Sequence, residues 1–177
     1  MARAMLRLAG KALTVVFLSL ALAVVLFHFV FQPFQVSGLS MAPTLDDKDY
    51  LLVDRVFFKH GGLERGDLVV FRHPQDGPFL VKRVIGVAGD VVSIREGRIV
   101  VNGSPAAGPG PSGASCPDFG PTVVPVDSAF CLGDNLPRSQ DSRSFGPVAF
   151  GEIYGKVLMR YLPLEKAGRV ERVRVGG

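Results

Sequence analysis

An uncharged apolar stretch of 20 residues, Ala12 to Phe31, is the feature that most constrains how this chain can fold. As an α-helix, which rises about 1.5 Å per residue, it would be roughly 30 Å long and would match the hydrocarbon core of a bilayer. The alternative is a cleaved secretory signal, but such signals have apolar cores of about 7–15 residues followed by a small-residue cleavage site. The motif Ala21-Leu22-Ala23 lies inside the stretch, so the sequence favours a retained transmembrane anchor over residues 12–31.

The charges that flank this stretch predict its orientation. Three basic residues and no acidic residue precede it, and the first basic residue after it is Lys48; the three are Arg3, Arg7 and Lys11. The positive-inside rule therefore predicts a cytoplasmic segment over residues 1–11. It also predicts that residues 32–177 form an extracytoplasmic domain on the periplasmic (outer) face of the cytoplasmic membrane, with the lipid bilayer as one partner.

The exported part is large enough for one domain with a hydrophobic core and too small for two large ones, since 146 residues follow the apolar stretch. The formal net charge of +4 and the pI of about 9.3 would be compatible with nucleic-acid binding. However, the body contains no arginine-rich run and no basic stripe with interleaved aromatic residues, so we expect no nucleic-acid partner. We also see no cluster of metal ligands and no phosphate-binding glycine loop, and we expect no cofactor.

The chain has two cysteines, Cys116 and Cys131. Two cysteines with no histidine nearby make a poor zinc site, which normally needs four ligands. In an oxidising compartment they could form one disulfide that closes a loop. We expect this disulfide, and two free thiols are the alternative.

The exported part is typical of a mainly β protein, because its apolar segments are short, rich in β-branched residues and separated by glycine. After the anchor, no long amphipathic helix pattern occurs. Residues 103–121 contain five Gly and five Pro, which indicates a small irregular insertion. The predicted strands are 49–57, 67–71, 79–87, 123–126, 129–132 and 153–161, with a hairpin over 91–101 that turns at Glu96-Gly97.

A candidate nucleophile, Ser40, lies a few residues beyond the anchor in a turn bracketed by glycine and proline, Gly38-Leu39-Ser40-Met41-Ala42-Pro43. The prolines on either side suggest the edge of a sheet, because proline cannot donate to a strand ladder. An edge strand can accept an extended peptide as an added strand, and Phe34 and Val36 would share one face of it. By itself, however, a serine in a turn is usually only a turn residue.

A nucleophilic serine needs a base, and the candidate that remains is Lys82. The three histidines lie in the apolar stretch or in polar segments without a partner pattern, which argues against a Ser-His-Asp triad. Lys82 lies within an apolar strand, where lost hydration would lower the pKa of its amine. The alternative is an exposed strand lysine whose stem packs on the surface, and neither Ser40 nor Lys82 is convincing alone.

Four segments in this chain resemble, in the same order, the conserved blocks of bacterial type I signal peptidases. They are Gly38-Leu39-Ser40-Met41-Ala42-Pro43-Thr44-Leu45, Arg65-Gly66-Asp67-Leu68-Val69-Val70-Phe71, Lys82-Arg83-Val84-Ile85-Gly86-Val87-Ala88-Gly89-Asp90, and Gly133-Asp134-Asn135 followed by Ser139-Gln140-Asp141-Ser142-Arg143. One such block would be a weak signal, whereas four in order over nearly the whole chain are specific. The resemblance implies an antiparallel β-sheet catalytic domain, a membrane-bound serine endopeptidase and preproteins with signal peptides as substrates.

The resemblance also implies roles for individual residues. Ser40 would attack the scissile carbonyl, Lys82 would be the general base, and Ser139 would hydrogen-bond and orient the Lys82 amine. Asp141 and Arg143 would form a charge pair that holds the scaffold of the site. Apolar residues would form the walls of shallow substrate pockets that favour Ala-x-Ala before the cut: Phe34, Val36, Met41, Leu80 and Val81.

Two positions depart from the pattern of that family. Some members have a serine two residues before the nucleophile as a donor to the oxyanion, and here Gly38 occupies that place, so only the Ser40 N–H remains as an expected donor. Leu136-Pro137-Arg138 replaces a more polar run. Two other functions stay open: a conjugation-type peptidase that processes pilins, and a non-catalytic, membrane-tethered β-module that binds peptides. Self-cleaving repressors share Ser/Lys chemistry, but the anchor argues against them.

Overall fold

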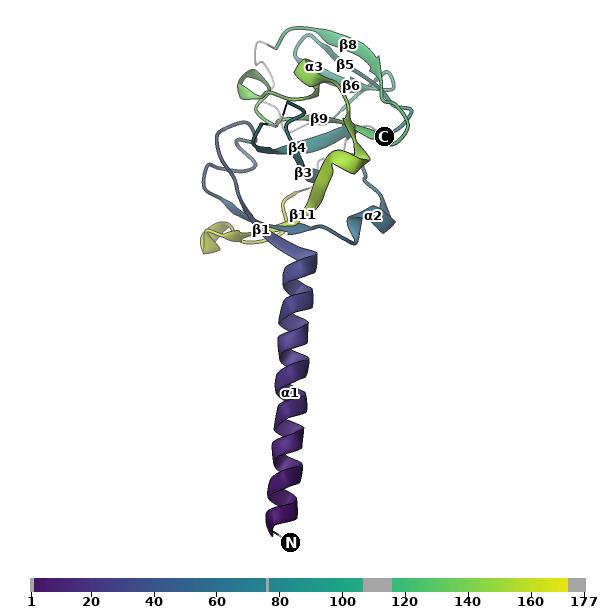
Figure 1. Cartoon of the computed structure of the whole chain (residues 1–177). Coiled ribbons are helices and arrows are strands. Elements are labelled where there is room, and N and C mark those ends of the chain that lie inside the picture. Colours follow the sequence, from purple (N-terminus) through teal and green to yellow (C-terminus); the bar gives the residue numbers. More distant parts are fainter. Residues whose placement is uncertain (1, 76, 107–115, 172–177) are drawn as a thin grey trace.

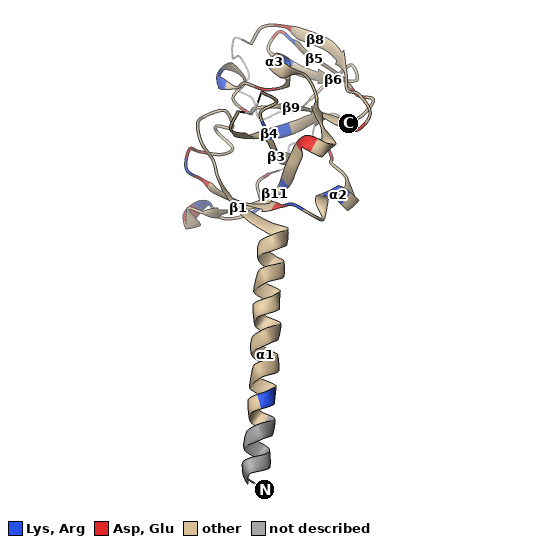
Figure 2. Ribbon diagram, viewed as in Figure 1, with Lys and Arg blue, Asp and Glu red and all other residues tan. Residues whose placement is uncertain are grey.

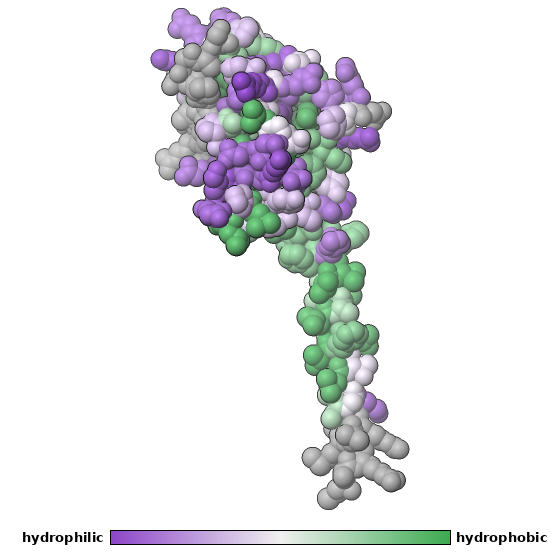
Figure 3. Space-filling model, turned by 90° about the vertical axis from the view of Figure 1, so that its left-hand side faces the viewer, coloured by the Kyte–Doolittle hydropathy of each residue, from purple (hydrophilic) through white to green (hydrophobic). Residues whose placement is uncertain are grey.

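The computed structural model describes residues 2–75, 77–106 and 116–171, with side chains from residue 9 onward. Helix α1 (Ala2–Val30) extends as a long rod from a compact β body (Figure 1). Within it, Ala9–Val30 has a mean hydropathy of 2.6 and is not buried by the rest of the chain. Figure 3 shows the apolar surface of this rod, which is long and apolar enough to cross a membrane. The predicted anchor extended to Phe31, but Phe31 begins the first strand.

The larger of two sheets is antiparallel throughout and is formed by segments far apart in the sequence. In sheet order its strands are β1 (Phe31–Gln35), β2 (Tyr50–Asp54), β11 (Ile153–Leu162), β3 (Leu68–Arg72), β4 (Phe79–Gly86), β9 (Ser128–Leu132) and β10 (Val148–Ala149). β1 lies at one edge, as the prolines near it predicted. The mainly β fold with one N-terminal apolar helix is therefore confirmed.

The smaller sheet lies at the end of the body away from α1 (Figure 1). Its strands, in order, are β7 (Ser104–Pro105), β6 (Arg98–Val101), β5 (Val91–Arg95) and β8 (Phe119–Val123). The short helical segments are α2 (Phe58–Gly61), η1 (Leu136–Arg138), α3 (Ser142–Phe145), η2 (Phe150–Glu152) and η3 (Leu164–Lys166). The hairpin of β5 and β6 with Glu96 and Gly97 at its turn is confirmed.

Two sequence predictions near the insertion were wrong. Residues 123–126 do not form a strand, because β8 ends at Val123 and Pro125 lacks the N–H that a ladder needs. Instead, the Val124 N–H donates to the carbonyl of Asp90 and its side chain is buried. The predicted irregular segment 103–121 supplies β7 and the start of β8, and its residues 107–115 lie outside the described part of the chain.

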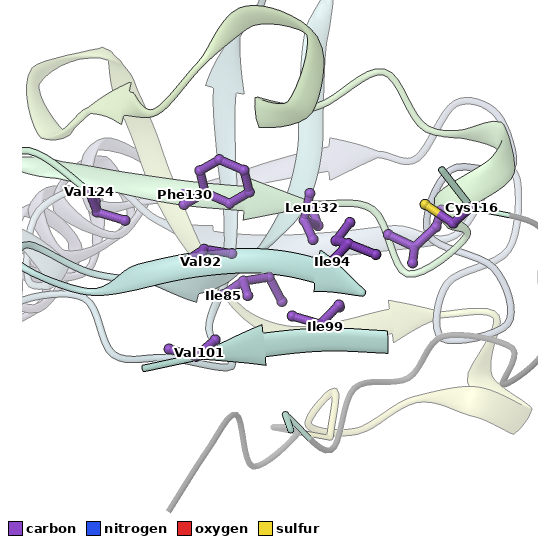
Figure 4. Packing of buried hydrophobic residues seen from close by; sticks show 10 residues of the cluster. Ile85, Val92, Ile94, Ile99, Val101, Cys116, Val124, Phe130 and Leu132 are labelled. Atoms are coloured by element: carbon purple, nitrogen blue, oxygen red, sulfur yellow. The ribbon is translucent and has the colours of Figure 1, made fainter. Parts of the chain in front are cut away.

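Strand β9 separates two parts of the core, because successive side chains of a strand point to opposite faces. Phe130 and Leu132 pack with Ile85, Val92 and the rest of the smaller sheet (Figure 4). Ala129 and Cys131 pack on the other face with residues of β3 and β4. A third cluster lies under β1 and β2 and includes Val36, Met41 and Val81. Side chains on both faces of β4 are therefore buried in the second half of the strand.

Candidate active site

Ser40 lies in a turn that directly follows edge strand β1. Within this turn the Ala42 N–H donates to the carbonyl of Leu39 at 3.2 Å. The backbone of Gly38 has a φ of +90°, which favours glycine, and its N–H donates to the Asp47 carboxylate at 2.8 Å. Met41, which directly follows Ser40, is buried in the core and holds the turn against the sheet. These contacts fix the backbone on both sides of Ser40.

A second loop, which follows β9, holds the Ser40 turn from the other side. The Asn135 N–H donates to the carbonyl of Ser40 at 3.0 Å, and Asn135 Nδ2 donates to the carbonyl of Leu39 at 3.0 Å. Gly133 allows this close approach, because a Cβ there would lie 2.5 Å from the Ser40 carbonyl oxygen. Both residues belong to the fourth sequence segment that resembles the family, but the sequence indicated no role for either.

Lys82 reaches Ser40 from strand β4, where it pairs with Val69 of β3. Its Nζ is 2.6 Å from Ser40 Oγ, although the two residues are 42 positions apart in the chain. The lysine is only 1% exposed. The structure therefore brings together the two residues that sequence analysis named as nucleophile and base.

Burial lowers the pKa of Lys82 from its ordinary value of 10.5 to about 8, because an ammonium loses hydration inside the protein. The negative charges of Asp141 and Asp134 act in the opposite direction and raise this pKa, while Arg143 lowers it. A pKa of about 8 leaves about a tenth of the amine neutral at pH 7. A neutral amine at this distance can accept the proton of the Ser40 hydroxyl.

Asp141 and Arg143 form the expected charge pair beside the site. Arg143 Nε is 2.8 Å from Asp141 Oδ1, and its Nη2 is 2.9 Å from Oδ2, an arrangement in which the guanidinium binds both carboxylate oxygens. Asp141 is fully buried and also accepts the Gly133 N–H at 3.1 Å. Arg143 Nη2 donates further to the carbonyl of Leu136 at 2.7 Å. The pair thus joins the loop after β9 to α3.

The predicted hydrogen bond from Ser139 to the Lys82 amine is absent. Ser139 Oγ is buried, and it has no hydrogen-bond partner among the described residues. Its hydroxyl lies over Gly133, where an added Cβ would collide with it. The residue follows the turn of η1, which contains Pro137, and this turn places the hydroxyl beside Gly133 instead of against the amine.

A buried ion pair between Arg83 and Asp134 lies behind the site, and sequence reasoning did not predict it. Arg83 Nε and Nη2 bind the two Asp134 carboxylate oxygens at 2.8 and 2.7 Å. The side chains of Arg83 and Asp134 are 0% and 2% exposed. Arg83 Nη1 also donates to the carbonyl of Gly66 at 2.8 Å. Lys82 and Arg83 are neighbours on β4, so they point to opposite faces and only the lysine faces Ser40.

The residues predicted to form the walls of substrate pockets separate into two groups. Phe34, Val36, Met41 and Val81 belong to one cluster beneath β1, and three of them are buried in it. Leu80 packs with the cluster on the other face of the sheet, as the alternation along β4 requires. Phe34 also contacts Phe79 edge to face, with ring centroids 5.6 Å apart, so apolar side chains bridge β1 and β4.

The predicted disulfide between Cys116 and Cys131 is wrong, because both cysteines are free and buried in the structure. Cys116 packs in the cluster under the smaller sheet, with Phe130 and Leu132 of β9 (Figure 4). Cys131 points to the opposite face of β9, so the strand itself lies between the two thiols. Cys116 Sγ instead lies 3.1 Å from Arg143 Nη1. In the described part of the chain, no group of three His, Cys, Asp or Glu side chains could hold a metal ion.

A serine hydroxyl in hydrogen-bonding reach of a desolvated lysine, on a β body that carries one apolar helix, is typical of membrane serine peptidases that use lysine as a base. The model of the family described as signal peptidase, peptidase S26, matches residues 9–162 of this chain. The chain belongs to this family, and it is a serine endopeptidase.

Three relatives found by sequence agree with this assignment. The chain is 35% identical over 162 residues to signal peptidase I of Leptolyngbya laminosa, an alignment of 86% of this chain and 79% of the relative. It is 35% identical over 168 residues to signal peptidase I T of Bacillus subtilis, with 89% and 86% covered. It is 36% identical over 171 residues to signal peptidase IB of Staphylococcus aureus, with 84% and 89% covered. A solved signal peptidase I from Enterococcus faecalis is 30% identical, covers 53% of this chain and 95% of its own, and superposes with a TM-score of 0.47.

Proposed function

We propose that this protein removes N-terminal signal peptides from exported preproteins, with Ser40 as nucleophile and Lys82 as general base. The observation that supports this proposal most directly is the 2.6 Å distance between Lys82 Nζ and Ser40 Oγ in a buried setting. Family membership supports the removal of signal peptides by a serine peptidase. The roles of the two residues are inferred from their geometry.

In the proposed reaction, Ser40 Oγ attacks the scissile carbonyl carbon while its proton passes to the neutral Lys82 amine. The resulting tetrahedral intermediate collapses, the C–N bond breaks, and the Lys82 ammonium returns the proton to the departing amine. The signal peptide is then bound to Ser40 as an ester. A water molecule attacks this ester with Lys82 again as base, and the hydrolysis restores the free serine.

The negative charge on the carbonyl oxygen needs donors at a fixed position. The Ser40 N–H is available for this role, since none of the hydrogen bonds between described residues uses it as a donor. The two hydrogen bonds from Asn135 to the carbonyls of Leu39 and Ser40 hold the peptide plane that contains this N–H and the plane that follows it. A donor that is fixed before the reaction stabilises the developing charge without reorganisation.

The substrate would bind in extended form between β1 and the first half of β4. β1 is at the edge of the sheet and pairs only with β2. β4 pairs with β9 only from Arg83 onward. The backbone of residues 79–82 is therefore not paired with β9 on that side. Backbone groups on both edges can hydrogen-bond an added strand. Phe34 and Phe79 bridge β1 and β4, and a shallow apolar site beside them would favour alanine-like residues, as cleavage after Ala-x-Ala requires.

The topology that we propose has α1 spanning the cytoplasmic membrane once, residues 1–11 in the cytoplasm and the β body on the outer face. In this arrangement Ser40 would follow the last residue of α1, Val30, by only ten residues and would lie close to the membrane surface from which a signal peptide emerges. An extended segment of the preprotein next to its membrane helix would therefore reach the site.

Incubation of the detergent-solubilised protein with a labelled secretory precursor tests the proposal. Ser40→Ala and Lys82→Ala should each abolish cleavage while circular dichroism shows an unchanged fold. Ser104→Ala and Lys166→Ala are matched controls on the exposed surface, and both should keep full activity. A Ser40→Ala protein that cleaves at the normal rate would end the proposal, and cleavage of pilin precursors alone would favour the conjugation-type alternative.

A further inference from the structure

A cavity of about 450 Å³ lies where helix α1 meets the β body. It is lined by residues from the end of α1, from α2 and its preceding loop, from η2 and from the sheet, among them Phe29, Arg55, Lys59, Arg72, Glu152 and Tyr154. The Arg55 N–H donates to the carbonyl of Val30 at 3.0 Å, so the loop that carries Arg55 is fixed to the last residue of α1. Ser40 and Lys82 do not line this cavity, and Phe79, which we place beside the substrate, is the side chain that the two regions share.

Exposed aromatic rings locate this cavity at the boundary between membrane and water. Phe29 is 72% exposed and Phe57 is 61% exposed, although both are large apolar side chains. The Phe31 ring lies between Phe27 and Phe57, with centroids 4.9 and 6.4 Å away. Tyrosine concentrates at membrane interfaces, and Tyr154 lines the cavity. Apolar phenylalanine rings that face outward at the end of a spanning helix fit the upper acyl region of a bilayer better than water. Figure 3 shows apolar surface continuing from the rod onto the base of the body.

The charge of the cavity is mainly positive. Among the described residues, Arg55 and Lys59 make no ion pair, and Lys59 is exposed. The Arg55 guanidinium lies over the Tyr154 ring, 4.5 Å from its centroid, which fixes the direction in which it points. Arg72 also lines the cavity and donates to the carbonyl of Gly77 at 3.4 Å, and Glu152 is the one acidic side chain among the described residues of the lining. Figure 2 shows one basic residue on α2, which is Lys59.

We propose that this cavity binds the headgroup phosphate of an anionic phospholipid in the leaflet next to the β body. A guanidinium and an ammonium at headgroup level can both contact a phosphodiester, and the aromatic side chains beside them can pack on its acyl chains. A zwitterionic lipid fits less well, because its own ammonium group would lie among the cationic side chains. The site would hold the body at a fixed height on the membrane, with edge strand β1 at the bilayer surface.

This inference depends on α1 spanning a bilayer and is independent of the chemistry at Ser40 and Lys82, so each can fail without the other. The test is native mass spectrometry of the full-length protein in detergent, titrated with phosphatidylglycerol or with phosphatidylcholine. Arg55→Gln/Lys59→Gln should weaken phosphatidylglycerol binding about 25-fold, since each juxtamembrane cation contributes roughly a factor of five. Binding of phosphatidylcholine should change less than twofold.

The control variant Arg95→Gln/Arg98→Gln removes two exposed cations from the hairpin of the smaller sheet and should bind phosphatidylglycerol like the wild type. The single change Lys59→Gln, at an exposed side chain, serves if the double variant loses its circular dichroism signal, and about a fivefold weaker binding is expected. Equal binding of phosphatidylglycerol by the wild type and a folded variant would overturn the proposal. Displacement of the lipid by an equal concentration of inorganic phosphate would overturn it too, because the ligand would then be a soluble anion.

Discussion

The amine of Lys82 lies 2.6 Å from the hydroxyl of Ser40, and the negative charge of the buried Asp141 carboxylate raises the pKa of that amine. Burial makes the ammonium unfavourable, while the negative charge of Asp141 partly restores it. The pKa of about 8 is the balance of these opposing effects. The same Asp141 accepts hydrogen bonds from Gly133 and Arg143, so one carboxylate affects both the charge of the site and its shape.

The first prediction concerns the pH dependence of cleavage. If Lys82 must be neutral to accept the Ser40 proton, the rate of precursor cleavage should rise about tenfold per pH unit below a pKa near 8 and level off above it. The pKa is lowered from 10.5, so the active, neutral form gains population as the pH increases through 8. Single-turnover cleavage between pH 5.5 and 9.5 measures this profile, and a flat profile would show that Lys82 is not the base.

A second prediction follows from the charge of Asp141. Asp141→Asn removes a carboxylate that raises the pKa of Lys82 and leaves Arg143, which lowers it, so the rising limb of the profile should move to lower pH. The maximal rate should fall, because Arg143 loses its partner and the loop loses its anchor. Asp127→Asn, in the exposed turn before β9, is the control and should leave the limb in place, because Asp127 does not shift the pKa of Lys82. A shift to higher pH would contradict the assignment.

The third prediction tests how closely the loop after β9 packs on the nucleophile turn. In Gly133→Ala, the new methyl group would lie 2.5 Å from the Ser40 carbonyl oxygen and would also collide with the Ser139 side chain. Because small displacements of reacting groups cost about 10²-fold in rate, we expect a loss of that size. Gly151→Ala has no atom within 4 Å of its added Cβ and should retain activity. Equal rates for the two variants would show that the loop does not position Ser40.

The parts of this protein that the sequence predicted well depend on local pattern. Apolar length predicted α1, and the Glu96-Gly97 turn between β-branched runs predicted the β5–β6 hairpin. The cysteine pairing failed because it depends on which face of β9 each thiol occupies, and the sequence does not show that a strand separates them. Arg83 was missed for a related reason: alternation along β4 places it opposite Lys82, but it does not reveal that Asp134 covers that face too.

The site was predictable only in part. Placing Lys82 in an apolar strand indicated a lowered pKa, and the resemblance in ordered motifs connected it to Ser40 across 42 positions. The orientation of Ser139 depends on the turn of η1, where Leu136-Pro137-Arg138 departs from the usual run. The contacts of Asn135 depend on two loops that meet only in the folded protein, and short-range sequence patterns carry no information about such a meeting.

The fourth prediction concerns Asn135. Asn135→Ala removes the Nδ2 donor to the Leu39 carbonyl but keeps the backbone hydrogen bond to Ser40, so we expect kcat to fall about tenfold with a stable fold. Asn135→Asp should lower kcat at least as much, because a carboxylate cannot donate a hydrogen bond to a carbonyl. Asn102→Gly is the control, since residue 102 has a positive φ that glycine adopts and lies on the distal sheet. If Asn135→Ala raised KM and left kcat unchanged, the residue would act on substrate binding instead.

The last prediction concerns the buried pair of Arg83 and Asp134. Asp134→Leu leaves the Arg83 guanidinium in a site where its side chain is 0% exposed, and breaking a buried pair in this way typically costs about 3–5 kcal/mol. The double change Arg83→Met/Asp134→Leu removes both charges, so a large part of that stability should return. Thermal unfolding of the full-length protein in detergent measures both effects. An Asp134→Leu protein as stable as the wild type would mean that water or another acceptor satisfies the guanidinium, and the pair would then contribute little to the fold behind Lys82.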